Sequence, residues 1–398
     1  MSAKVLILFL ETYDAGGQDS VSRILFQNLK VSKIHVFVNK RNDNRILKLS
    51  KVHDSVTVHR YSLLGTSELS DIAYKINNKQ IRFLLRLINI IIKYPLIFIS
   101  IPYFYFKFKH LNPDVVMSIN GGYPAAEYCR SSVLAATFLN NTNIFMVFFN
   151  KAAPSKRIFS YLEKVYDKFL DNRVTFICDS YENAKNLNIY RNFRQKVITI
   201  HNGQKVKKIT HGEGISRKFK MLNVAGFEDR KNQLMLVSVI HKLVLNGNFD
   251  IELTLIGHEM ESGYLKKVEK KIQNLKLEKY IRIVGYTESL KNFYENSHVF
   301  LLSSKGESLP VVVTEAASYE LPIIATKVGG LSEQVRSNYN GFLVESGNIL
   351  DMVDKVCFFI DHPTQREVMG KNSHNYFLKK FTVKKMISNY NQTLGLSK

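Results

Sequence analysis

The sequence has few cysteines, few acidic residues and no apolar run long enough to cross a bilayer. Cys129, Cys178 and Cys357 lie far apart among the 398 residues. This pattern argues against a disulfide framework or a zinc site and for a reducing compartment. No stretch approaches the ~18–20 apolar residues of a membrane span, and residues 1–17 read as a buried first strand rather than a secretory signal. We therefore expect a globular protein without a span or a leader.

The shortage of acidic residues leaves a net charge of +22, from 56 Lys and Arg against 34 Asp and Glu. Such an excess suits nucleic acid, an anionic membrane surface or anionic substrates. Zinc-finger spacing, an aromatic RNA-recognition signature and a clustered basic helix are all missing, so we predict no nucleic-acid partner. Lysines spread over the surface are the alternative explanation for part of the excess.

One basic region is unlike the rest. Residues 79–109 contain six basic residues and no acid. On a helix, Arg82, Arg86, Asn89 and Lys93 would form a narrow cationic stripe. The uncharged run 94–106 that follows contains two prolines, which argue against a membrane-spanning helix. A basic stripe beside apolar and aromatic residues suits peripheral contact with a membrane surface, and the alternative is a buried helix with its basic edge in water.

Short β-branched runs alternate with helical patterns along the chain. This alternation predicts an α/β fold with two facing, doubly wound, Rossmann-like parallel-sheet domains and a cleft between them. We expect a first domain over 1–202, a second domain over 203–378, and a C-terminal helix over 379–398 that packs back on the first domain. The predicted strands are Val5–Leu10, Ile34–Val38, Val56–His59, Val115–Ile119, Ile144–Phe148, Thr175–Cys178, Ile198–His201, Met221–Val224, Glu252–Ile256, Ile281–Val284, Val299–Leu302, Ile323–Thr326 and Phe342–Val344. The predicted helices include Ser20–Leu29, Lys231–Leu245, Tyr264–Asn274 and Ile349–Ile360.

Ligands of such folds bind in loops after strands. Gly16 and Gly17 follow the first strand and enter a helix, where the backbone can approach an anion. A dinucleotide GxGxxG motif is absent, and a glycine pair alone is more often a turn. The "HNG" at 201–203, with Asn202 and Gly203, is also a turn by default.

The segment "GESLPVVVTEA" at 306–316 places Glu307 and Glu315 eight positions apart. On one helix that spacing is about 12 Å along the axis, which suits one elongated ligand held at two points. Ser308 can cap a helix, Pro310 fits its first turn, and Val311–Ala317 would continue as a buried helix. A carboxylate in that apolar run needs donors such as the hydroxyls of a ribose.

This segment resembles the Glu-x7-Glu signature of retaining glycosyltransferases with the GT-B fold, the glycogen-synthase-like family 4. Further sequence motifs resemble those of the family and occur in the same order over nearly the whole chain. They are "GGQDS" at 16–20, "INGGYPAAEYCR" at 119–130, "ICDSYENAKNL" at 177–187, "VITIHNG" at 197–203, "VAGFEDRKNQ" at 224–233, "LIGHE" at 255–259, "VGYTESL" at 284–290 and "FTVKKMISNY" at 381–390.

The resemblance implies that 1–202 is the acceptor-side domain and 203–378 the nucleotide-sugar-binding domain, and it implies roles for individual residues. Glu307 would bind the transferred sugar, helped by the backbone of Ser308, Leu309 and Pro310, and Glu315 would hold the nucleotide ribose. Lys231 would meet the diphosphate together with Gly16 and Gly17, so Glu307 and Lys231 are the catalytic candidates. The predicted donor-binding residues are Gly16, Gly17, Asn202, Gly203, Lys231, Glu307, Ser308, Leu309, Pro310 and Glu315. On the acceptor side they are Asn120, Gly121, Gly122, Tyr123 and Asn150.

Two positions depart from the family. Gly226 stands where an arginine is usual, and Phe149 where a histidine is usual. Arg217, Lys218 or Arg230 are the candidates to replace the missing arginine. No Asp-x-Asp is present, so we expect no metal and no cofactor beyond the nucleotide-sugar substrate.

The expected function is a metal-independent, hexosyl-type transferase in surface polysaccharide synthesis of the O-antigen or capsule type. We expect a lipid-linked saccharide acceptor, used at the cytoplasmic face of the inner membrane. The alternatives are another enzyme on this scaffold, such as an epimerase or a phosphorylase, and a non-catalytic subunit.

Overall fold

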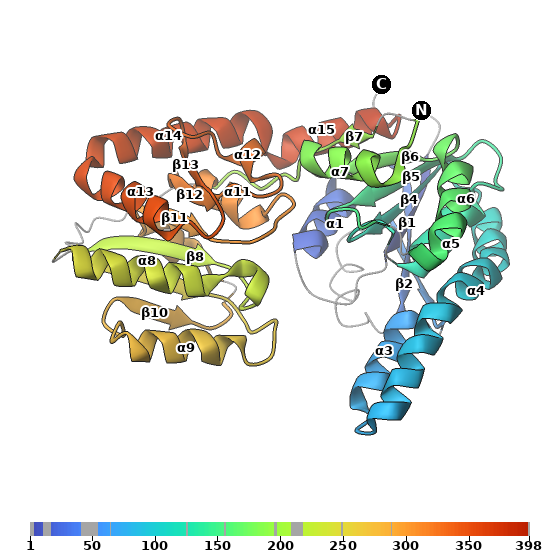
Figure 1. Cartoon of the computed structure of the whole chain (residues 1–398). Helices are drawn as coiled ribbons and strands as arrows, with labels where there is room; N and C mark the ends of the chain where they lie inside the picture. The colour runs from blue at the N-terminus through green and yellow to red at the C-terminus, as the bar shows by residue number, and fades with distance from the viewer. Residues whose placement is uncertain are drawn as a thin grey trace. The chain divides into compact units, whose positions relative to one another are not determined.

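The protein was analysed as a computed structural model that describes residues 4–10, 17–40, 55–63, 65–124, 126–154, 157–194, 197–207, 218–247, 250–287 and 289–396. The chain divides into two compact units. Unit 1 contains Met1–Ile200 and Ile387–Lys398, and unit 2 contains His201–Met386. Figure 1 shows that each unit has its own sheet with helices packed against it.

Unit 1 is built on a sheet in the order β3-β2-β1-β4-β5-β6-β7, with every described strand pair parallel. Because parallel neighbours need crossover connections, helices cover its faces. The strands are β1 Val5–Leu10, β2 Lys33–Asn39, β3 Val56–Tyr61, β4 Val115–Asn120, β5 Asn143–Phe148, β6 Thr175–Cys178 and β7 Ile198–Thr199. The helices are α1 Gly17–Asn28, α3 Thr66–Lys75, α4 Lys79–Leu111, α5 Glu127–Ala136, η2 Arg157–Phe159, α6 Ser160–Asp171 and α7 Tyr181–Arg191.

Unit 2 repeats the same topology in the order β10-β9-β8-β11-β12-β13, again with parallel pairs. Its strands are β8 Phe219–Val224, β9 Ile251–Ile256, β10 Ile281–Val284, β11 Val299–Leu302, β12 Ile323–Thr326 and β13 Gly341–Val344. Its helices are η3 Asp229–Lys231, α8 Gln233–Asn246, α9 Tyr264–Asn274, α10 Lys291–Glu295, α11 Val311–Ser318, α12 Leu331–Gln334, α13 Ile349–Asp361 and α14 Pro363–Lys380. The last helix, α15 Val383–Thr393, begins in unit 2 and ends in unit 1.

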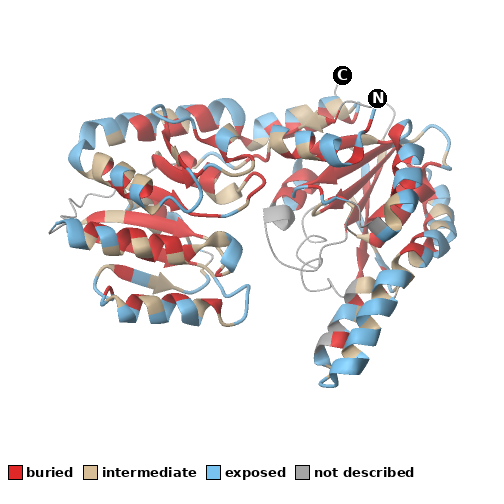
Figure 2. Cartoon of the chain, viewed as in Figure 1, coloured by how far each residue is buried: buried red, intermediate tan, exposed pale blue. Residues whose placement is uncertain are grey.

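The cores follow from the apolar strands. β4 and β11 are buried along their whole length, as expected for central strands covered by helices on both faces. Figure 2 shows the strands largely in the buried colour, whereas the outer sides of many helices are exposed. Each predicted strand overlaps an observed one, and the prediction of two Rossmann-like parallel-sheet domains is confirmed. The facing arrangement and the cleft stay predictions.

Two boundaries differ from the sequence-based expectation. The helix predicted from Lys231 begins at Gln233, because Asn232 has a left-handed backbone with φ of 53° and ends the short helix η3. The two prolines of region 79–109, from which we argued against a membrane-spanning helix, do not interrupt the helix. α4 runs through Pro95 and Pro102 for 33 residues.

The prolines are tolerated because both lie on the exposed side of α4. A proline removes the hydrogen bond to the carbonyl four residues earlier, and on this side water can reach the freed carbonyl. The opposite side holds the helix in place, since Ile97, Phe104 and Phe108 are buried in the core of unit 1. By length and composition, α4 is also the one helix among the described residues that could cross a membrane.

Candidate functional site

The candidate site of unit 2 lies where the strand order reverses. β8 and β11 are neighbours, and their connections leave in opposite directions along the sheet. Ligands of doubly wound sheets bind at such a switch point, beyond the carboxyl ends of the strands. The loop after β8 leads to Lys231, and the loop after β11 carries Glu307. Two residues 76 positions apart are thereby brought to one edge of the sheet.

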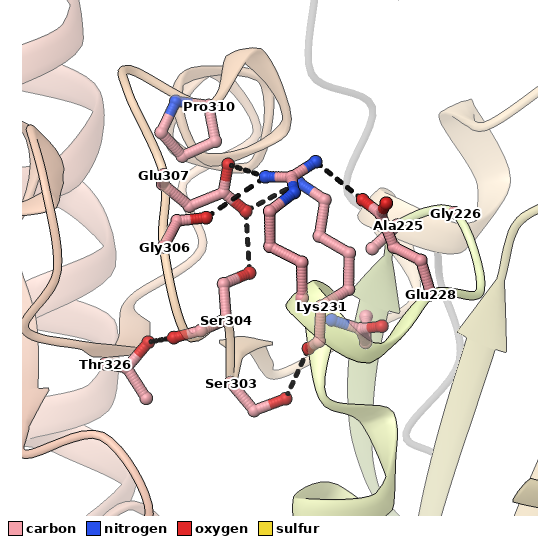
Figure 3. A network of polar contacts seen from close by, with 12 residues as sticks. Ala225, Gly226, Glu228, Lys231, Ser303, Ser304, Gly306, Glu307, Pro310 and Thr326 are labelled. Carbon is pink, nitrogen blue, oxygen red and sulfur yellow. Dashed lines mark hydrogen bonds and ion pairs between the residues drawn. The ribbon is translucent and has the colours of Figure 1, made fainter. Parts of the chain in front are cut away.

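Lys231 and Glu307 form an ion pair, with 2.5 Å between Lys231 Nζ and Glu307 Oε1. Ser304 Oγ donates to the same carboxylate oxygen at 2.6 Å. Ser304 is itself held, because Thr326 Oγ1 donates to its carbonyl at 2.6 Å. Figure 3 shows these side chains converging from the two loops. Glu307 is buried and Lys231 is 15% exposed along its side chain, so a negative ligand could reach the lysine.

The backbone of Glu307 is packed closely against Gly329. Gly329 has φ of +55°, and a Cβ there would lie 1.8 Å from the Glu307 carbonyl oxygen. The neighbouring Gly330 N–H donates to Ser308 O at 2.8 Å. The loop after β12 therefore supports the loop after β11, and only glycine fits at position 329.

Arg230 adds a second cation to Glu307. Its Nη1 lies 3.3 Å from Glu307 Oε2 and donates to Gly306 O at 3.0 Å, and its Nη2 contacts Glu228 Oε1 at 2.5 Å. The side chain is 50% exposed. The sequence named Arg230 only as one of three candidates to replace an arginine, because neither motif nor spacing linked it to Glu307. Of the other two, Arg217 lies outside the described residues, and Lys218 precedes β8.

Gly226 has little room for a larger side chain. An added Cβ would lie 2.5 Å from Met260 Cγ, so a side chain there needs Met260 to move. The Gly226 carbonyl accepts a hydrogen bond from Gln233 Nε2 at 2.9 Å. The loop after β8 is thus compact at Gly226, and Arg230, four residues later, is the arginine of this loop that contacts Glu307.

Glu315 lies on α11 in a partly apolar setting. Burial is the main influence and raises the pKa of Glu315, whereas Lys207 and a hydrogen bond from Tyr294 oppose the rise in pKa. Tyr294 Oη donates to Glu315 Oε2 at 3.3 Å, and its ring stacks on Tyr319 with centroids 5.1 Å apart. The hydrogen bond of Glu315 is thus to Tyr294 rather than to Lys231 or Glu307, and the carboxylate keeps acceptor capacity for a ligand hydroxyl.

The start of α11 differs in detail from the prediction. Pro310 occupies the N-cap position, and the helix begins at Val311 without a side-chain cap. Ser308 is therefore not the N-cap that we predicted, because it lies two residues further from the helix. Leu309 is 3% exposed and belongs to the core, so its side chain faces inward and only its backbone is left for a ligand.

Asn202 and Gly203 lie elsewhere in unit 2. A Cβ on Gly203 would lie 2.6 Å from Thr382 O, and Gly203 N–H points to Met386 Sδ at 3.2 Å. Asn202 is buried, and its Oδ1 has no hydrogen-bond partner among the described residues. The glycine thus serves a close contact with the segment after α14, whereas the asparagine keeps an open acceptor.

Unit 1 has the equivalent switch point between β1 and β4. Gly16, predicted after β1, lies outside the described residues, and Gly17 opens α1. After β4, Asn120 is buried, and Gly121 O accepts a hydrogen bond from Phe149 N at 3.0 Å. The Nδ2 group of Asn120 has no partner among the described residues.

The loops after β4 and β5 lie against each other. A Cβ on Gly122 would lie 2.9 Å from Lys151 O and 3.4 Å from Asn150 Cβ. Asn150 is exposed, whereas Phe149 is 7% exposed and packs inward. Of the predicted acceptor-side group, Asn120, Gly121, Gly122 and Asn150 are therefore brought together.

Tyr123 is placed differently from its neighbours. Its side chain is 1% exposed, and its hydroxyl donates to Asp167. The Arg191 guanidinium lies 4.7 Å from the centre of its ring. Its hydroxyl is therefore used inside unit 1, which leaves its backbone for contact with a ligand.

The carboxylates behind Tyr123 form a buried charged network. Glu163 pairs with Arg130 at 2.8 Å and with Arg191 at 2.9 Å. Arg191 also pairs with Asp167 at 3.3 Å and donates to Ala153 O at 3.3 Å. This network, which sequence reasoning missed, joins the loops after β4 and β5 to α6 and α7.

No group of three or more metal-ligating side chains occurs within the residues that the structure describes. The chemistry that the site of unit 2 offers is instead electrostatic. Two cations meet one buried carboxylate at the carboxyl ends of β8 and β11, and a second carboxylate lies further along α11. Such a set can hold a ligand that has both phosphate and hydroxyl groups.

Comparison with known proteins places part of this chain in a known family. Residues 206–376 match the family described as glycosyl transferases group 1. A glycosyltransferase of unknown specificity from Methanocaldococcus jannaschii is 29% identical over 198 residues, which are 49% of this chain and 52% of that protein. The capsular polysaccharide biosynthesis glycosyltransferase CapH of Staphylococcus aureus is 24% identical over 268 residues, 65% of this chain and 72% of that protein.

A third relative is the UDP-Gal:alpha-D-GlcNAc-diphosphoundecaprenol alpha-1,3-galactosyltransferase of Escherichia coli. It is 25% identical over 204 residues, 48% of this chain and 52% of that protein. The chain spans about half or less of the length of several curated relatives that it matches.

Solved structures cover the whole chain. A glycosyltransferase from Rickettsia africae superposes with a TM-score of 0.77 at 15% identity, over 99% of this chain and 98% of the other. HepE of Anabaena in complex with UDP and glucose gives 0.72 at 16% identity, over 99% of both chains. The chain therefore has the GT-B fold throughout, and its residues 206–376 match the group 1 glycosyl transferase family.

Proposed function

We propose that this protein transfers a hexosyl group from a nucleotide-sugar to a saccharide acceptor, with retention of the anomeric configuration. The observation that carries the proposal is the pair formed by Lys231 and Glu307, with Arg230 beside it, at the switch point of unit 2. Similarity to group 1 glycosyl transferases supports it over residues 206–376. HepE, which has the same fold, is described in complex with UDP and glucose.

The donor diphosphate would bind Lys231 and Arg230. Negative charge builds up on the diphosphate as its bond to the sugar breaks, so cations held at that place lower the barrier. Glu307, freed in part from Lys231, would accept hydrogen bonds from the sugar hydroxyls. Glu315 would accept hydrogen bonds from the ribose, and the backbone from Ser308 to Pro310 would complete the donor site.

Retention would follow from attack on the face that the diphosphate leaves. The acceptor oxygen forms a bond to the anomeric carbon while the bond from that carbon to the diphosphate oxygen breaks. The acceptor hydroxyl proton passes to the departing phosphate oxygen. This route needs neither a protein nucleophile nor a metal, and we propose a metal-independent reaction that continues in EDTA.

The acceptor would be a lipid-linked saccharide in surface polysaccharide synthesis, at the cytoplasmic face of the inner membrane. The names of two relatives support this choice, since one acts in capsule synthesis and the other on a diphosphoundecaprenol-linked sugar. Unit 1 would bind it through the loop from Asn120 to Tyr123 and through Asn150, and region 79–109 would contact the membrane peripherally.

A second candidate is a donor-binding subunit without catalysis. Gly226 and Phe149 favour it, because the two replaced residues leave the donor site with fewer polar side chains, and Phe149 packs inward. Another enzyme on this scaffold, an epimerase or a phosphorylase, would turn over the donor without an acceptor saccharide.

Calorimetric titration with UDP, GDP and ADP, followed by a donor and acceptor screen with anomeric analysis of the product by NMR, tests the proposal. We expect micromolar to millimolar binding of one nucleotide and a product with retained configuration. Binding without turnover would favour the non-catalytic subunit. Inverted product, or no binding of any nucleotide, would contradict the proposal.

A further inference from the structure

α4 exposes a continuous apolar stripe. Along the helix, its members follow one another at intervals of three, four or more residues, which keeps them on one side of a 3.6-residue turn. The last member lies 22 positions after the first, which is roughly 33 Å along the axis at 1.5 Å per residue. The stripe includes Leu84, Ile88, Ile91, Pro95, Phe98 and Phe106. The exposed fraction reaches 66% at Ile91 and 67% at Phe106, which is unusual for large apolar side chains on a soluble protein.

Parts of the other sides of α4 contact the rest of unit 1. Ile97, Phe104 and Phe108 pack into the core of unit 1. In the first half of the helix, Arg82 donates to Ile76 O, and Asn89 donates to Thr66 O and Ser70 Oγ. Two residues of the predicted cationic stripe thus attach α3. A helix packed in this way suits a position along a membrane surface better than a crossing of the bilayer.

α6 has a similar outer side. Ile158 in η2 and Tyr161, Val165 and Phe169 in α6 are exposed, with 81% exposure at Ile158 and 76% at Tyr161. They lie three or four residues apart and therefore share one side of the helix.

Charge on α6 is divided by sign between its two sides. The carboxylates Glu163, Asp167 and Asp171 are buried, whereas Lys164 and Lys168 are exposed. The helix therefore presents only positive charge beside its exposed apolar residues.

Phe138, which follows α5, joins the two outer sides. Its ring lies 6.3 Å from Phe169 and 6.5 Å from Tyr105 of α4, measured between centroids. Basic groups border this aromatic row, with Arg173 5.1 Å from the ring of Phe169 and Lys109 5.6 Å from that of Tyr105. In Figure 1, α4, α5 and α6 lie next to one another in unit 1. The apolar exposure is thus one connected surface.

We propose that the outer sides of α4 and α6, joined by Phe138, form a single docking surface for an anionic lipid bilayer. This docking surface deepens the proposed function, because it assigns the membrane contact to the apolar stripe and adds α6 to region 79–109. α4 contains no acid, and the acids of α6 point inward. Lys109 lies three residues after Phe106 on the same side of α4, and Lys164 and Lys168 are exposed on α6. These lysines would reach lipid phosphates while the apolar side chains enter the headgroup region.

Charge favours a bilayer over a second copy of the chain. Two copies related by a twofold axis would bring basic residues against basic residues, which costs binding energy. A sheet of anionic lipid supplies the opposite sign along the whole ~33 Å of the stripe.

The absence of tryptophan from the sequence makes a clean test possible. Single variants Phe98→Trp and Tyr161→Trp place one fluorophore on each half of the docking surface, and Tyr286→Trp, 69% exposed in unit 2, is the matched control. Vesicles of phosphatidylcholine with and without phosphatidylglycerol are added, without donor or acceptor. We expect a blue shift and protection from iodide at positions 98 and 161 with anionic vesicles, and neither at 286. A shift at 98 alone would overturn the two-helix surface, and no shift at either would overturn docking.

Charge reversal gives a second measurement. Removing one basic residue near an anionic surface weakens binding roughly fivefold, so Lys164→Glu with Lys168→Glu should lower vesicle co-sedimentation by at least about 25-fold. Lys266→Glu with Lys267→Glu, exposed on α9, should leave it within about twofold. If the wild type instead self-associates in light scattering and ignores vesicles, the occupant is a second copy. Sugar transfer to a soluble acceptor without vesicles is measured separately, so docking and catalysis can fail independently.

Discussion

The two units share one strand order and differ in where they keep their charges. Unit 1 buries an Arg130–Glu163–Arg191 network and exposes large apolar side chains on α4 and α6. Unit 2 places its principal charged cluster at strand ends, where Lys231 and Arg230 are partly exposed around buried Glu307. Its helix α9 is amphipathic in the usual way, because its apolar residues Tyr264, Val268 and Ile272 are buried.

This difference shows that the fold does not decide what each unit can bind. Buried charges in unit 1 are costly unless they are paired, and here they hold two loops while the outer surface is left to apolar and basic groups. Accessible charges in unit 2 suit a small anionic ligand. The same strand order therefore supports an extended apolar and basic surface in unit 1 and a small-ligand site in unit 2.

The largest effect should come from the pair at the centre of unit 2. Glu307→Gln or Lys231→Met removes a charged group that would act on the donor, so sugar transfer should fall by about 10²–10³-fold with little change in thermal unfolding. The measurement is the initial rate under saturating donor. Glu345→Gln or Lys327→Met alters an exposed pair 3.7 Å apart in the same unit and should leave the rate unchanged. Full activity in either Glu307→Gln or Lys231→Met would show that this ion pair is not the catalytic site.

The buried network of unit 1 should respond to pH through Asp167. Burial, opposed by Tyr123 and Arg191, raises the pKa of Asp167 from 3.8 to about 6. The folded chain then keeps a proton that the unfolded chain releases, so this contribution to stability is present below pH 4 and is lost as the pH rises to 6. From pH 4 to 7 the free energy of unfolding of the wild type should fall by about 3 kcal/mol relative to Asp167→Asn.

Chemical denaturation at several pH values measures that difference. The substitution Asp171→Asn, at another buried carboxylate of α6, is the matched control, and it should retain the pH dependence that Asp167→Asn removes. If the curves of wild type and Asp167→Asn stay parallel between pH 4 and 7, the buried network is not the sensitive part of unit 1.

A smaller effect should come from Arg230, the half-exposed cation beside Glu307. Arg230→Ala should weaken nucleoside diphosphate binding by about tenfold, the lower end expected for a charged hydrogen bond from a half-exposed group. Calorimetry measures the affinity. Lys305→Ala removes a cation of similar exposure, 48%, that pairs with Asp229, and should change the affinity less than Arg230→Ala. Equal effects would mean that general charge, not position, attracts the ligand.

The smallest effect should lie in the α3–α4 pair. Arg82 donates twice to Ile76 O, at 2.7 and 3.1 Å, so Arg82→Ala should destabilise the end of α3 by about 1 kcal/mol. Amide hydrogen exchange of α3 reports this locally. Arg86→Ala, at an exposed residue one turn along α4, should leave the exchange unchanged. Unchanged exchange in Arg82→Ala would show that the two hydrogen bonds add nothing to the attachment of α3.

Much of the architecture could be predicted because it is local. Runs such as Val115–Ile119 and Val299–Leu302 consist largely of residues that favour strands, and each matches an observed strand. The path of α4 could not be predicted in the same way. Local rules for proline expect a break at Pro95, whereas packing of Ile97 and Phe104 against the core keeps the helix whole.

The candidate site residues also divide into those that the sequence could indicate and those that only the structure could. Glu307, Glu315 and Lys231 carried recognisable motifs, and their binding roles stay predictions. Arg230 carried no motif, since its contact with Glu307 joins residues 77 positions apart. Tyr123 appeared in a ligand loop by sequence, and only its burial against Asp167 shows that its hydroxyl is occupied.

The sequence by itself determined the alternation of strands and helices and the two-unit α/β class, because hydrophobic periodicity and turn residues act within a few positions. Only the tertiary structure decided which charges are buried, which cations surround Glu307 and which side of α4 remains exposed. Those outcomes depend on contacts between residues far apart in the chain, where burial changes the free energy of a charge or an apolar side chain more than its neighbours in sequence do.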